Sequence, residues 1–153
     1  MEPMIRGQKV ALSAGAQRAV AAWASLKVLV ARYAHNPPEP VEGAWIDHLY
    51  RNHRPPPSWL VWIATYSGGE PIYYEGRDIT VEFQGLGHEQ TPHGVLATMV
   101  VGRLALKVLG VRAGTPPYRR HDAIIRIGPL SDLYVYWPME APLDDEGLVR
   151  LPW

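Results

Sequence analysis

The chain has 153 residues, with 15 Lys plus Arg balanced by 15 Asp plus Glu, and it contains no cysteine. This length is enough for one domain with a real core, and the 47% hydrophobic and 20% charged fractions are typical of a globular protein rather than a disordered one. The missing cysteines exclude disulfides, thiolate zinc sites and cysteine nucleophiles, and the zero net charge disfavours nucleic-acid binding through an overall basic surface.

The first long element is a predicted helix over residues 14–33, with Ser13 as its N-cap. This segment is rich in alanine and has no proline, and its apolar residues cover almost the whole circumference. We therefore expect the helix to be buried on most sides. Lys27 lies near its middle, and we expect its stem to pack while its amine reaches water, in preference to a desolvated amine.

A second, shorter helix is predicted over residues 41–53, after a stretch in which three of residues 36–40 are proline. Its predicted apolar face carries Ala44, Trp45, His48 and Leu49. His48 and His53 are five residues apart and do not share a helical face, so we do not expect them to bind a metal.

The strands begin after the prolines at 55–57. Residues 59–66 are apolar on both alternating faces, which is typical of an interior strand. Residues 72–75 and 78–83 are predicted to pair around a turn at Gly76-Arg77. The residues of this pair expected to face inward are Ile79, Val81 and Phe83.

Residues 95–109 allow three interpretations, which are a hairpin turning at Gly102-Arg103, one long strand, or a helix. Many β-branched residues favour the hairpin. Residues 124–127 and 133–137 are two further predicted strands, and the acidic run at 144–146 predicts a short final helix. The expected fold is a single α+β domain over residues 1–153, with two N-terminal helices on an antiparallel sheet of about five to seven strands.

No catalytic motif is present, because the glycine-rich phosphate loops, the GxSxG elbow and HExxH all fail to match. The least ordinary cluster is a loop with His88 and His93, which could join Arg119, Arg120 and His121 in the site of a small enzyme or a ligand-binding protein, where the arginines bind a phosphate or carboxylate. A metal held by these histidines with Asp122 is the less favoured interpretation, and we expect no metal or cofactor. Nucleic-acid binding through Arg112, Arg119 and Arg120 is a further alternative.

Several segments together resemble the region that follows a small HNH-like zinc module in bacterial proteins of unknown function. The segments are MIRG at residues 4–7, AAWA at 21–24 with Lys27, LY at 49–50, PPP at 55–57 and PLDDEGL at 142–148. The resemblance implies an accessory domain that meets nucleic acid only through an upstream zinc module. The zinc-binding cysteines of that module are absent here, so no functional residue is carried over.

The preferred interpretation is therefore a non-catalytic interaction domain. Six Trp and eight Tyr against one Phe are typical of a core or a subunit interface, which indicates self-association as a homo-oligomer. The N-terminus lacks the apolar stretch of a signal peptide, and the apolar run at 19–31 is interrupted and too short for a membrane span. We expect a cytoplasmic protein with no membrane partner.

Overall fold

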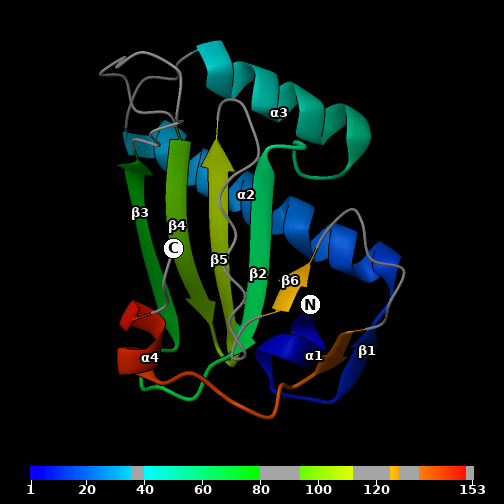
Figure 1. The fold of residues 1–153 in the computed structure, drawn as a ribbon, viewed down its shortest axis with the longest axis vertical. Coiled ribbons are helices and arrows are strands. Elements are labelled where there is room, and N and C mark those ends of the chain that lie inside the picture. The colour runs from blue at the N-terminus through cyan, green and yellow to red at the C-terminus, as the bar shows by residue number, and fades with distance from the viewer. Residues whose placement is uncertain (36–39, 80–93, 112–124, 128–134, 151–153) are drawn as a thin grey trace, which may run out of the picture.

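The computed structural model describes residues 1–35, 40–79, 94–111, 125–127 and 135–150, and within them the fold is α+β as expected (Figure 1). The helices are α1 (Glu2–Ile5), α2 (Ala14–His35), α3 (Pro40–Asn52) and α4 (Asp145–Arg150). The strands are β1 (Val10–Leu12), β2 (Trp59–Thr65), β3 (Ile72–Ile79), β4 (Gly94–Val101), β5 (Leu104–Val111), β6 (Ile125–Ile127) and β7 (Val135–Trp137). In the described part of the chain, no helix combines the length and the apolar character that a membrane crossing requires.

The main sheet has five antiparallel strands in the order β3-β4-β5-β2-β6. The predicted hairpin is confirmed, because β4 and β5 pair along their whole length around Gly102, whose φ is +57°. Strand β7 does not belong to this sheet. It pairs instead with β1, a short strand that the sequence pattern did not predict, with Val10 opposite Trp137.

One predicted turn is wrong. Gly76 and Arg77 do not form a hairpin turn, because β3 runs without a break from Ile72 to Ile79 and pairs throughout with β4. The long β4 offers a continuous ladder, and Gly76 adopts the extended conformation opposite Ala97. Val81 and Phe83 lie outside the described residues.

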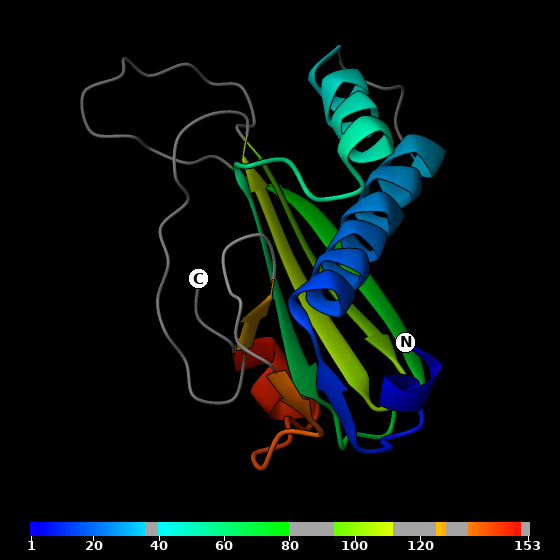
Figure 2. The ribbon, with the colours of Figure 1, turned by 90° about the vertical axis from the view of Figure 1, so that its right-hand side faces the viewer.

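The long helices cover one face of the sheet. Figures 1 and 2 show α2 crossing that face diagonally, with α3 beside it, while α4 lies on the opposite side. The buried face of α2 is formed by Val20, Ala21, Ala24, Val28 and Leu29, and it packs on alternate residues of β2, β4 and β5. Helices on one face of an antiparallel sheet were expected, and this arrangement confirms them.

The other side of α2 is not buried. Leu26, Val30 and Tyr33 are 43%, 54% and 46% exposed, so the expectation of burial on most sides is wrong. The physical reason is that the sheet meets only one side of the helix, and the described elements leave these three side chains open to solvent. We call them the α2 stripe.

A tryptophan pair ties α3 to the sheet. The rings of Trp45 in α3 and Trp59 in β2 meet edge to face, with centroids 5.2 Å apart. The Trp59 ring lies over Gly110 of β5, where an added Cβ would fall 2.4 Å from the ring. Gly110 therefore leaves the space in which this contact between the helix and the sheet forms. Four tryptophans of the described residues are buried, namely Trp45, Trp59, Trp62 and Trp137.

We predict that Gly110→Ala lowers the free energy of unfolding by about 2–3 kcal/mol, because the new methyl group displaces the Trp59 ring into an already filled core. Urea denaturation followed by tryptophan fluorescence measures this loss. Gly43→Ala is the matched control, since a Cβ on Gly43 in α3 would meet no atom within 4 Å. It should leave the stability unchanged or slightly raised, and equal losses in both variants would contradict the prediction.

Candidate functional site

A row of polar side chains crosses the sheet on the face away from α2. The strand register places Glu75 of β3 opposite Thr98 of β4, and Thr98 opposite Lys107 of β5. Lys107 is opposite Trp62 of β2, which is opposite Arg126 of β6. Because directly opposite residues point to the same side of a sheet, these five side chains share one face.

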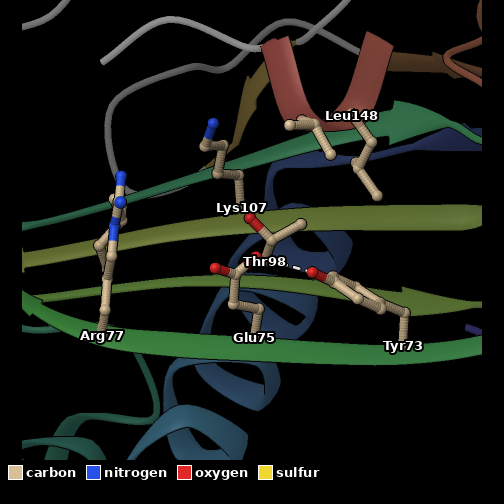
Figure 3. A pocket seen from close by; sticks show the side chains of 8 residues that line it. Tyr73, Glu75, Arg77, Thr98, Lys107 and Leu148 are labelled. Carbon is tan, nitrogen blue, oxygen red and sulfur yellow. Dashed lines mark hydrogen bonds between the residues drawn. The ribbon is translucent and has the colours of Figure 1, made fainter. Parts of the chain in front are cut away.

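Three members of this row line a pocket with a cavity of about 140 Å³. Figure 3 shows the side chains of β3, β4 and β5 rising from the sheet, with Leu148 of α4 above them. The pocket is lined by Tyr73, Glu75, Arg77, Leu96, Thr98, Lys107, Leu148 and Val149. It thus combines both signs of charge and two hydroxyl groups with an aliphatic wall, so it offers partners to both the polar and the apolar parts of a small molecule.

Among the described residues, Lys107 has the pKa that departs furthest from its ordinary value. It is 4% exposed in the middle of β5, where every other residue is uncharged and buried. The pKa of Lys107 is lowered from 10.5 to about 7, mainly by burial and then by the charge of Arg77, while the carboxylate of Glu75 partly opposes both effects. Near neutral pH the amine is therefore present in both its charged and its neutral form.

Tyr73 and Glu75 form the floor of the pocket on β3. The Tyr73 hydroxyl donates a hydrogen bond to Glu75 Oε2 over 2.6 Å. This bond to a carboxylate, together with burial, raises the pKa of Tyr73 above its ordinary value. Glu75 is thereby fixed in position beside the lysine and the threonine.

The α4 wall is fixed by Tyr66, which follows β2. The Tyr66 hydroxyl donates to Asp145 Oδ1 and accepts the backbone N–H of Glu70 over 3.1 Å. Burial, and then the bond to Asp145, raise the pKa of Tyr66. The backbone joins the same two segments, since Leu143 donates to Thr65 and Ser67 donates to Leu143, both over 2.8 Å. These contacts hold Leu148 and Val149 at the mouth of the pocket.

The sequence analysis predicted a ligand site on other residues, none of which lines this pocket among the residues that the structure describes. His88, His93, Arg119, Arg120 and His121 all lie outside the described residues. Arg112 and Asp122, named in the alternatives, also lie there.

Two other sequence predictions can be followed. Lys27 reaches the surface of α2 as expected, with Nζ 5.7 Å from the centroid of the Trp23 ring. His48 and His53 lie near the C-terminal end of α3, and the described residues contain no group of three His, Asp or Glu side chains placed to hold a metal. The sequence analysis did not single out Lys107. The signal was a lone charge inside the strand LALKVLGV.

No protein-family model, curated protein or solved structure matches the chain. The pocket must therefore be interpreted from its own chemistry.

We predict that Lys107→Met makes the protein more stable near pH 7, and that this gain shrinks as the pH rises. Between pH 7 and pH 9 folded Lys107 is mostly neutral while the unfolded lysine keeps its proton, so the unfolded state binds more protons and wild-type stability increases with pH. Methionine removes this dependence. The stability difference should fall by about 2 kcal/mol over that range, as measured by urea denaturation at each pH. A difference independent of pH would contradict the prediction.

Proposed function

We propose that this chain is a binding domain that takes a small zwitterion, an aliphatic α-amino acid, in the pocket above Lys107. The observation that carries the proposal is the in-register placement of Glu75, Thr98 and Lys107 across three strands, with Arg77 beside them and aliphatic side chains above. No nucleophile–base pair or metal is needed for such a role.

The two signs of charge match the two ends of the ligand. Arg77 and Lys107 suit a carboxylate, to which guanidinium and ammonium groups make strong charge-assisted hydrogen bonds. Glu75 suits an ammonium group. Residues two apart on one strand, such as Glu75 and Arg77, are separated by about 7 Å. An amino acid together with its hydrogen bonds spans such a gap.

The wall of the pocket suits an aliphatic side chain. Leu96 of β4 and Leu148 and Val149 of α4 supply apolar surface beside the charged groups. The cavity of about 140 Å³ is smaller than the 300 Å³ or more that drug-sized ligands occupy, so it favours a compact ligand.

We expect calorimetric titration with L-valine to show binding that Glu75→Gln, Arg77→Ala and Lys107→Met each weaken at least tenfold. 3-Methylbutanoate, which lacks the amino group, and isobutylamine, which lacks the carboxylate, should each bind more weakly than valine. Arg6→Ala is the control, because Arg6 pairs with Glu2 on α1 and does not line the pocket. If valine, leucine and alanine all fail to bind, the proposal is wrong.

The same binding should strengthen as the pH falls from 8 to 6, by up to about tenfold. The carboxylate favours the charged form of Lys107, whose pKa of about 7 lies within this range, while the zwitterion itself does not change its charge. Titrations at three pH values check this, and Lys107→Met should bind with a constant, weaker affinity. A wild-type affinity that does not change with pH would show that Lys107 does not contact the ligand.

A second function, self-association, is favoured by the α2 stripe. Leu26, Val30 and Tyr33 follow one another at intervals of four and three residues, the spacing with which helices pair in coiled coils. We propose that two copies of the chain meet through this stripe. The suggested role as an accessory to an upstream HNH-like module stays a prediction, and it is compatible with either proposal.

We expect Val30→Glu to convert a wild-type dimer into a monomer in sedimentation velocity, because a charge in the middle of the stripe would be buried between the two helices. Ile72→Glu is the control, since Ile72 is 76% exposed on the edge strand β3 and does not belong to the α2 stripe. A wild-type chain that is monomeric at high concentration, or a dimer that survives Val30→Glu, would contradict self-association through α2.

A further inference from the structure

A second concavity lies on the other side of the sheet, where α2 begins and α3 ends. Its volume is about 460 Å³, and we call it the α2–α3 groove. The groove is lined by Gly15, Arg18, Ala19, Asn52, His53 and Arg54. Among the residues that the structure describes, none lines both this groove and the pocket above Lys107.

The described lining residues are rich in hydrogen-bond donors and include no carboxylate. Arg18 and Arg54 form no ion pair with any residue that the structure describes, and neither does His53. Several other arginines of the described residues do form ion pairs. The paired ones are Arg6 with Glu2, Arg32 with Asp78, Arg51 with Asp47 and Arg150 with Glu146. No acidic side chain that the structure describes therefore neutralises the charge of these two guanidinium groups.

The backbone on both sides of Arg54 is held in place. His53 has a φ of +51° in the left-handed region and donates its N–H to the carbonyl of Leu49 over 2.9 Å, which ends α3. Asn52 donates from Nδ2 to the carbonyl of His48 over 3.0 Å. The following Pro55 and Pro56 are buried, so the segment cannot swing away.

The opposite wall is equally well held. Ser13 caps α2 by accepting the N–H of Ala16 over 3.3 Å, and Gln17 donates from Nε2 to the carbonyl of Leu12 over 3.0 Å. These bonds fix the first turns of α2, which carry Gly15 and Arg18. Gly15 has no side chain and Ala19 has only a methyl group, so this wall leaves room beside Arg18.

We infer that the α2–α3 groove binds a phosphate group. Guanidinium groups present planar pairs of N–H donors that match the oxygens of phosphate, and an imidazole and an amide add further donors. Two arginines on separate, rigid walls can contact the same phosphate without first losing an ion pair to a described residue. Either a free phosphate compound or the phosphodiester backbone of nucleic acid offers this chemistry.

The test is calorimetric titration of the full chain with sodium pyrophosphate and, separately, with a short DNA duplex of mixed sequence. At low salt we expect one of these probes to bind, with an affinity that Arg18→Ala and Arg54→Ala each reduce at least tenfold. Both substitutions are at exposed positions, and circular dichroism checks that the variants are folded. Arg51→Ala is the matched control, because it removes the same charge from α3 at a side chain that pairs with Asp47 and does not line the groove.

Each result decides the inference. Pyrophosphate binding that depends on both arginines assigns the groove to a free phosphate compound, and duplex binding with the same dependence assigns it to a phosphodiester backbone. Lys107→Met should leave either affinity unchanged, which separates the groove from the amino-acid pocket. Failure of both probes to bind the wild-type chain would overturn the inference. So would a loss of affinity in Arg51→Ala as large as in Arg18→Ala, because it would show attraction by overall charge alone.

Discussion

The inner strands β2 and β5 are buried on both faces, and the rest of the described fold is organised by the need to cover them. On one face, α2 and α3 bury Val61, Ile63 and Leu106. On the other, the C-terminal segment brings Leu143 and Leu148 onto Ala64 and Ala105. A two-layer arrangement would leave one apolar face in water, so the second face needs cover from a distant part of the chain.

That second cover creates the pocket. Tyr66 and Asp145 are 79 residues apart in the chain, and their hydrogen bond holds α4 beside the β3 strand. Gly68 lies so close to both side chains that an added Cβ would fall 2.3 Å from each. The wall of the site is therefore built by the same contacts that seal the core, and its shape depends on the docking of the C-terminal segment.

Lys107 interrupts this sealed face with a group that is costly to bury. A leucine or methionine at this position would cover the sheet without any penalty for removing a charge from water. A strongly perturbed lysine inside a cavity, accompanied by Glu75, Arg77 and Thr98, is instead typical of sites that bind or react. In the α2–α3 groove, on the other side of the sheet, the charged side chains of Arg18 and Arg54 are instead exposed to water on a fixed backbone.

The sequence by itself determined the type of most elements. The alanine-rich α2, the helix α3 after its prolines and the doubly apolar β2 follow from local composition and periodicity, because each pattern strongly favours one backbone conformation. For the β4–β5 hairpin periodicity left three interpretations open, and the β-branched residues favoured the correct one. The sequence was misleading at Gly76-Arg77, where a local turn signal lost to the ladder along β4, and at α2, where an apolar circumference did not mean burial on every side.

Tertiary structure alone decided which residues meet. Glu75, Thr98 and Lys107 come from three strands, and only the register of pairing aligns them, because a shift of one residue would turn each side chain to the other face. The same holds for β1 with β7 and for Arg18 with Arg54, whose proximity depends on how α2 and α3 pack. Local pattern sets the conformation of a segment, whereas its neighbours are set by the burial of the whole sheet.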